Sequence, residues 1–228
     1  MANQFKLTYN IDVVFCIDAT GSMGSIIDKV KANAINFYSD LKTEMEKKGK
    51  EISTLRTRVI VYRDYIADKE EAMMATEFFT LPEEIGAFNE TVHSIRAFGG
   101  GDEPEDGLEA LAFAIRSKWN KEGVKKRHII VVWSDASTHT LGYSKDVPNY
   151  PAGMAADLSE LTNWWGGVQN DGYMDCNAKR LLLFTPDKPG WTDIANSWGN
   201  VIHFPSQAGN GLKEIDYSQI LDVIANSI

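Results

Sequence analysis

Apolar runs and apolar stripes alternate along the chain, and this alternation predicts its secondary structure. A short run that is apolar at every position is typical of a strand covered on both faces, as in a parallel sheet. Two segments, 11–18 and 128–135, contain such runs at 13–17 and 129–133, and each segment ends in a carboxylate. Further runs rich in strand-forming residues occupy 57–62, 77–81, 180–185 and 200–204. The pattern therefore predicts six strands.

Helices are predicted between these strands, where apolar residues recur at spacings of three and four. The longest stripe places Ile27, Val30, Ala34, Phe37 and Leu41 on one helical face. Shorter stripes predict helices that start near residues 85, 108, 158, 191 and 217. Strands that alternate with helices indicate βαβ units. We expect an α/β fold with a Rossmann-like, doubly wound, mostly parallel six-stranded sheet, helices on both faces and a single domain over 1–228.

Composition narrows the function classes. The net charge of -9 argues against a nucleic-acid surface, because phosphate binding requires clustered basic residues. No apolar run approaches the roughly 18 residues of a membrane span, and the first residues lack the pattern of a signal peptide, so we expect no membrane contact. The two cysteines, Cys16 and Cys176, are too few for a disulfide framework or a zinc site. These features favour a cytoplasmic location.

Oxygen-bearing side chains follow the first predicted strand. Asp18, Thr20 and Ser22 occupy alternate positions, so in an extended turn their side chains converge and offer only oxygen atoms. The carboxyl edge of an open α/β sheet is where ligands bind. Hard-oxygen ligands suit Mg²⁺, with Mn²⁺ and Ca²⁺ as alternatives, and do not suit a soft metal.

Two further acidic loops are expected at the same edge. Asp135 ends the run 128–135, and Asp102 and Glu105 lie in a glycine-rich loop that opens the helix near residue 108. Carboxylates that converge in a partly desolvated site repel one another, and a divalent cation removes that conflict. The sequence therefore predicts a cation site built from three separated loops.

At these residues the sequence resembles the von Willebrand factor type A (vWA) family and its metal-ion-dependent adhesion site. The segment 18–22 is similar to the Asp-x-Ser-x-Ser element of that family, with Thr20 in place of the first serine. Asp135 matches the aspartate that follows a later strand. The segment 102–105 departs from the common threonine version and resembles the Asp-x-Pro-Glu loop of integrin β subunit inserted domains.

The resemblance implies a role for each matched residue. Hydroxyls and Glu105 would contact the ion directly, two aspartates would do so directly or through water, and Asp102 would serve an adjacent second cation. The implied metal residues are Asp18, Thr20, Ser22, Asp102, Glu105 and Asp135. The implied function is a non-enzymatic protein-interaction module in which a partner's carboxylate completes the metal site. An intracellular scaffold or regulatory role is expected. The negative charge of Glu105 would weaken the pull of the ion on that carboxylate.

Two alternative interpretations of Asp18 stay open. Aspartate also favours the N-cap of a helix. The segment 18–22 is also superficially similar to the Asp-x-Asp-x-Thr motif of Mg²⁺-dependent haloacid-dehalogenase-like phosphotransferases, in which Asp18 would be the nucleophile. That chemistry needs a second acid two positions on, where Thr20 cannot shuttle a proton at neutral pH.

Two other places have competing interpretations. Asp64 follows the strand at 57–62 and either joins the acidic edge or pairs with Arg63. The adjacent Trp164 and Trp165 point in different directions on a helix, so we expect only one of them to be buried on the inner face. One of the two is a candidate for contact with a partner.

Overall fold

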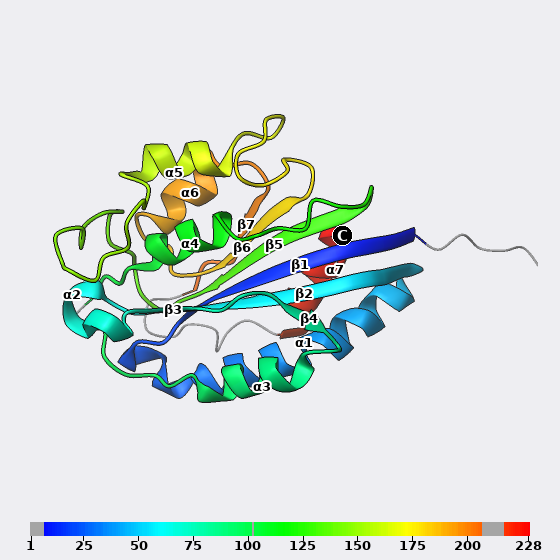
Figure 1. Cartoon of the computed structure of the whole chain (residues 1–228), viewed down its shortest axis with the longest axis horizontal. Helices are drawn as coiled ribbons and strands as arrows, with labels where there is room; N and C mark the ends of the chain where they lie inside the picture. Colours follow the sequence, from blue (N-terminus) through cyan, green and yellow to red (C-terminus); the bar gives the residue numbers. More distant parts are fainter. Residues whose placement is uncertain (1–6, 102, 207–216) are drawn as a thin grey trace, which may run out of the picture.

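The computed structural model describes residues 7–101, 103–206 and 217–228, whose strands form one sheet. The central strands β1 (Leu7–Asp18) and β5 (Lys126–Trp133) pair in parallel. On one side β2 (Lys50–Tyr62) runs parallel to β1, and on the other side β6 (Lys179–Phe184) and β7 (Val201–His203) continue the parallel sheet. Neighbouring parallel strands therefore end at one common edge (Figure 1).

The sheet differs from the prediction beyond β2. Two three-residue strands, β3 (Met73–Ala75) and β4 (Phe79–Leu81), both pair antiparallel with β2. The prediction had one edge strand at 77–81 and missed β3, because its two methionines and one alanine lack the β-branched and aromatic side chains that are typical of strands. The described strands number seven instead of six, in the order β3-β2-β1-β5-β6-β7 with β4 paired to β2. The mostly parallel, Rossmann-like α/β class is confirmed.

Helices cover both faces of the sheet (Figure 1). One layer contains α1 (Ile27–Lys47), α3 (Ile85–Ser94) and α7 (Tyr217–Ser227). The other contains α4 (Gly107–Ile115), α5 (Leu158–Trp165) and α6 (Trp191–Ser197). No helix in the described part of the chain is long and apolar enough to cross a bilayer.

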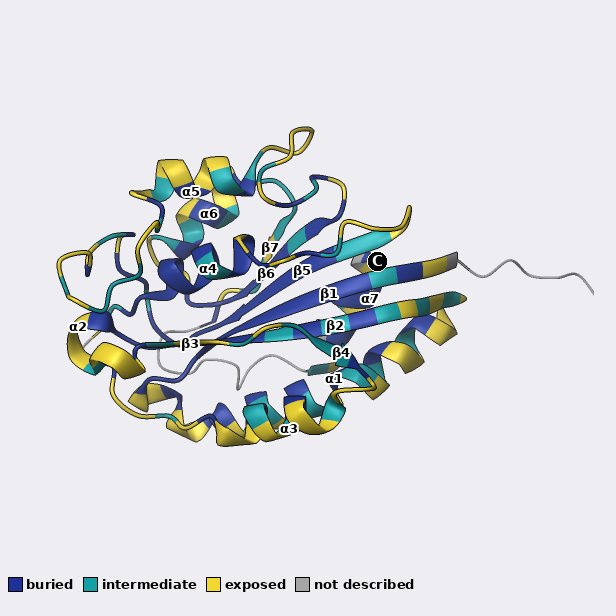
Figure 2. Ribbon diagram, in the orientation of Figure 1, coloured by how far each residue is buried: buried dark blue, intermediate teal, exposed yellow. Residues whose placement is uncertain are grey.

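The central strands contribute to two hydrophobic cores, because alternate side chains point to opposite faces of a sheet. Phe15 and Ile17 pack in the core beneath α1, whereas Val14 and Cys16 face the layer of α4, α5 and α6. All four side chains are at most 1% exposed. Figure 2 shows the buried strands between layers of helices, of which α1, α3 and α5 have exposed outer faces. Burial on both faces explains why these strands appear in the sequence as uninterrupted apolar runs.

The long connection after β5 packs over α4. Residues 136–153 contain turns and one backbone bridge, between Thr138 and Glu105, but no extended strand or helix. The backbone N–H of Gly142 and the hydroxyl of Tyr150 donate to Oε1 of Glu109, at 3.0 and 2.9 Å. Because Glu109 is fully buried in α4, these bonds fix the connection to the helix beneath it.

Candidate metal centre

Asp18 lies at the end of β1, and both oxygens of its carboxylate accept hydrogen bonds. The backbone N–H and the hydroxyl of Thr20 donate to Oδ1, at 2.9 and 2.6 Å. The hydroxyl of Ser134 donates to Oδ2 at 2.7 Å. Asp18 has no solvent-exposed surface. The carboxylate is therefore held in one orientation by residues of two loops.

The first and third predicted loops meet directly. The hydroxyl of Ser22 donates to Oδ1 of Asp135 at 2.8 Å and lies 3.1 Å from the hydroxyl oxygen of Thr20. The sheet explains this proximity, because the pairing of β1 with β5 continues to Ile17 and Trp133. The two loops that carry Ser22 and Asp135 therefore begin side by side. Residues that are far apart in sequence become neighbours at that edge.

Glu105 reaches the same place from the second loop. Its backbone N–H donates to the carbonyl of Ser137 at 3.1 Å, and its carbonyl accepts from the backbone N–H of His139 at 2.8 Å. Its side chain lies across Gly100 from Thr20: a Cβ on Gly100 would lie 2.6 Å from Oε1 of Glu105 and 2.8 Å from the Cβ of Thr20. Only a residue without a side chain fits between them.

These residues surround a hollow of about 230 Å³. Thr20, Ser22, Glu105 and Asp135 all line it, together with the glycines at 99–101. Asp18 does not line the hollow but is bonded to Thr20, which does. Five of the six predicted metal residues thus come together, and the sixth, Asp102, lies outside the described residues.

The electrostatics of this cluster favour a cation. Burial, and then the carboxylate of Asp18 and those of further aspartates, raise the pKa of Glu105 to about 10. Burial also raises the pKa of Asp18 to about 6, although the hydroxyls of Thr20 and Ser134 act against it. Oε2 of Glu105 is buried and accepts no hydrogen bond from the described residues. The oxygen donors and the uncompensated negative charge fit a hard divalent ion.

Asp64 does not pair with Arg63, and it lies close enough to Glu105 to raise the pKa of that residue without lining the hollow. Its Oδ1 accepts from the backbone N–H of Ala67 at 2.7 Å, which caps a short helix α2 (Tyr65–Asp68), and its Oδ2 lies 3.1 Å from Nε2 of His139. Arg63 donates to backbone carbonyls, including that of Ala19, and does not pair with Asp64. Asp64 is also absent from the lining of the hollow.

Two residues that support the site were missed by sequence reasoning. Ser134 bonds Asp18, and Asp68 accepts from the backbone N–H of Gly100 through Oδ2 at 2.9 Å. The position of Ser134 directly before Asp135 was a usable signal. Asp68 had none, because its contact with the glycine loop bridges 32 residues.

A second group of possible ligands lies elsewhere in the described chain. Ligand atoms of Asp171, Asp175 and Cys176 lie within 4.8 Å of one another. However, Lys126 already pairs with Asp175 at 3.0 Å, and Oδ1 of Asp171 accepts from the backbone N–H of Cys176 at 2.7 Å. This group has local partners that account for its geometry.

Comparisons with known proteins give distant likenesses. No model of a known protein family matches the chain. The alpha-protein kinase vwkA of Dictyostelium discoideum is 26% identical over 157 residues, which are 66% of this chain and 23% of that protein. The vWF domain of the type V pili tip protein Mfa5 from Porphyromonas gingivalis matches with a TM-score of 0.39 and 18% identity, over 57% of this chain and 39% of that chain.

A further structural likeness covers almost the whole chain. The pilus adhesin SpaC from Lactobacillus rhamnosus GG matches over 98% of this chain and 31% of its own, with a TM-score of 0.50 and 10% identity. The chain thus spans less than two fifths of the length of each of these proteins. The sheet topology and the likeness to part of vwkA support a von Willebrand factor A-like domain.

Proposed function

We propose that this domain is a protein-interaction module that binds a divalent cation at the edge where β1 and β5 end. Mg²⁺ is the preferred ion, with Mn²⁺ and Ca²⁺ as alternatives, because the donors are carboxylates and hydroxyls. Thr20, Ser22 and Glu105 would hold the ion directly. Asp18 and Asp135 would hold it directly or through water molecules. A second ion near Asp102 belongs to the same proposal.

The observation that carries this proposal is the environment of Glu105. Its side chain is 5% exposed, its Oε2 has no donor among the described residues, and its neighbours are further carboxylates. A buried acceptor without a partner is costly. A cation in the adjacent hollow would supply the missing positive charge and allow Glu105 to ionise at neutral pH.

The partner is a protein that contributes a carboxylate to the ion. The hollow is bordered by backbone at Gly99, Gly100 and Gly101, which lets an incoming group approach closely. Because Glu105 adds negative charge to the site, the attraction for a partner's carboxylate is weaker than at a site with a neutral second ligand. The proposal includes an intracellular, cytoplasmic scaffold or regulatory role.

A phosphotransferase that uses Asp18 as nucleophile is not supported by the geometry. Asp18 has no exposed surface, and hydroxyl or backbone donors occupy both of its oxygens. Thr20, at the position where that chemistry requires an acid, donates to Asp18. The kinase activity that the name of vwkA indicates belongs to a protein of which this chain spans 23%, so it gives no reason to assign catalysis here.

Cation-dependent stability tests the proposal. An ion that binds only the folded state raises its melting temperature by mass action. The wild-type chain, stripped with a chelator, should gain stability on titration with Mg²⁺, Mn²⁺ or Ca²⁺, whereas Asp18→Ala should fold but gain nothing. Glu122→Gln, a change to an exposed acid away from the hollow, is the control and should respond like the wild type. An equal response of Asp18→Ala and wild type would refute the site.

A further inference from the structure

A second hollow, of about 280 Å³, lies over the outer face of α4. Its lining includes Ala112 and Phe113 of α4, Met154 of the long connection and Trp164 of α5, with Arg58 and Arg116 as its charged residues. We call it the arginine hollow. The helix α4 separates the arginine hollow from the cation edge. Glu105 precedes the helix and Arg116 follows it, and the helix axis between them is about 14 Å long.

The sequence of α4 explains why apolar surface is left at this position. Every residue of the helix except Phe113 is buried, and all but Glu109 are apolar or glycine, so the helix requires cover on its outer face. The long connection covers the first turns, where it bonds to Glu109. Phe113 lies one turn further and remains partly exposed, beside Met154 and Trp164, which are partly exposed as well. Trp165, by contrast, is fully buried.

Both charged groups of the arginine hollow are guanidiniums that contact only neutral acceptors. Arg58 donates to the carbonyl of Thr76 and to the hydroxyl of Ser117, each at 2.6 Å. Arg116 donates to the carbonyl of Gly153 at 2.6 Å, and its guanidinium carbon lies 5.1 Å from the ring centre of Trp164. Within the described chain, neither arginine forms an ion pair with a carboxylate.

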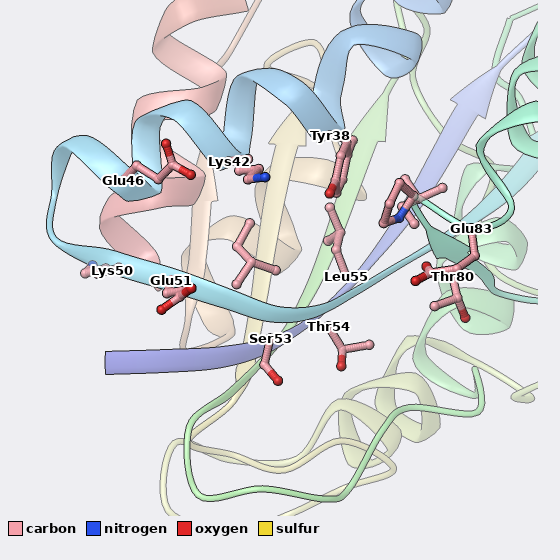
Figure 3. Close-up of a pocket in the computed structure, with 13 residues that line it drawn as sticks. Tyr38, Lys42, Glu46, Lys50, Glu51, Ser53, Thr54, Leu55, Thr80 and Glu83 are labelled. Carbon is pink, nitrogen blue, oxygen red and sulfur yellow. The ribbon is translucent and has the colours of Figure 1, made fainter. Parts of the chain in front are cut away.

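The charge of this hollow is unusual for the molecule. The chain carries a net charge of -9, yet no acidic residue lines the arginine hollow. The hollow between α1 and the start of β2 shows the ordinary case (Figure 3): there Lys42 and Lys50 lie among Glu46, Glu51 and Glu83, so charges of both signs are present. A hollow whose charged lining residues all have the same sign favours an occupant of the opposite charge, whereas a hollow with charges of both signs does not.

We infer that the arginine hollow docks an acidic segment of a partner protein, with an aromatic or large aliphatic side chain packed on Phe113 and flanking carboxylates bound by Arg58 and Arg116. The composition fits this occupant, because tryptophan, arginine, methionine and phenylalanine are enriched in the centres of protein interfaces. Guanidinium groups also bind carboxylates through paired hydrogen bonds. The contact needs no metal, so it is independent of the cation site.

Selection of short random peptides displayed on phage, with the whole chain as bait and excess chelator present, tests this inference. The enriched peptides should carry aspartate or glutamate on both sides of an aromatic or large aliphatic residue. Synthetic copies should bind Arg116→Glu at least about tenfold more weakly than wild type, the loss expected for one charged hydrogen bond. Arg116→Gln, which keeps the aliphatic stem, should give a smaller loss.

Lys118→Glu is the matched control, because it makes the same charge change two residues away on a side chain that is 81% exposed and does not line the hollow. It should bind the peptides nearly as wild type does. Enriched peptides without acids, equal losses for Lys118→Glu and Arg116→Glu, or displacement by free hydrocinnamate at the concentration at which the peptide binds would each overturn the inference. Glu105→Gln should bind normally, which separates failure here from failure of the cation site.

Discussion

The hydroxyl of Ser22 donates a 2.8 Å hydrogen bond to the carboxylate of Asp135, although 113 residues separate the two. The bond joins the loop after β1 to the loop after β5 at the common edge of the sheet. The bond also occupies a lone pair on Oδ1 of Asp135 that a bound cation could otherwise use. A change at either Ser22 or Asp135 therefore affects the other residue. Predictions about this edge therefore concern residues that hold the cluster together as well as those that would touch the ion.

Ser134→Ala should weaken cation binding without removing a proposed ligand. The hydroxyl of Ser134 donates to Oδ2 of Asp18 at 2.7 Å and keeps that carboxylate oriented and ionised. Loss of such a supporting bond typically lowers metal affinity by about 10- to 100-fold. Calorimetric titration with Mn²⁺ would measure the change, and Ser39→Ala on the exposed side of α1 should leave the affinity unaltered. Equal affinities for all three chains would contradict the role of Ser134.

Gly100→Ala should damage both stability and cation binding. The new Cβ would lie 2.6 Å from Oε1 of Glu105, and the φ of +95° at this position strains any residue with a side chain. Such strain costs on the order of 1–3 kcal/mol. Gly24→Ala is the control, since its Cβ would meet nothing within 4 Å and its φ is not positive. Urea unfolding of both variants would give the difference, and similar midpoints would show that the Gly100 packing is unimportant.

The stability of the metal-free chain should fall as the pH rises through the range in which Glu109 ionises. Burial raises the pKa of Glu109 from 4.5 to about 7, so the folded state retains a proton that the unfolded state has lost. The contribution of protonated Glu109 to the free energy of unfolding is fully present below about pH 4.5 and is lost progressively up to about pH 7. It amounts to on the order of 3 kcal/mol at most.

Glu109→Gln separates this effect from other titrations. The amide oxygen still accepts from Gly142 and Tyr150, but the side chain no longer ionises. Unfolding free energies measured between pH 4.5 and 8 should therefore decline less steeply for the variant than for wild type. Parallel profiles would indicate that Glu109 does not titrate in this range.

Lys179→Met should destabilise the fold strongly. The Lys179 side chain is fully buried, and its ammonium group donates to the carbonyls of Trp165, Gly166 and Gly167 at the C-terminal end of α5. Methionine fills a similar volume but leaves those acceptors without a donor, at a cost of about 1–3 kcal/mol for each that stays dry. Lys121→Met, at an exposed position, should change the melting temperature little. A small effect at Lys179 would mean that water replaces the ammonium group.

The fold was predictable where burial and periodicity agreed. The runs ending at Asp18 and Asp135 are covered on both faces, and the stripe from Ile27 to Leu41 packs on the sheet, so each left an unambiguous pattern. The short strand β3 left none, because its three residues, two methionines and an alanine, are neither β-branched nor aromatic and are too few to show a period.

The site was predictable to the extent that its members end strands. Asp18 and Asp135 follow neighbouring parallel strands, which brings them together whatever the loops do. Contacts that depend on loop conformation were not accessible, as the cases of Asp64 and Asp68 show. Asp64 turned back to cap α2 and approach His139, whereas Asp68 reached across to Gly100.

The bridge between Glu105 and Thr138 has a consequence for how such domains diverge. The bonds that tie the second loop to the third run from main chain to main chain, at Ser137 and His139. Because most residues carry the same peptide N–H and carbonyl groups, the side chains along this backbone bridge can change in evolution while its hydrogen bonds are kept. Relationships among domains built this way will therefore be easier to recognise from their backbone structures than from their amino-acid sequences.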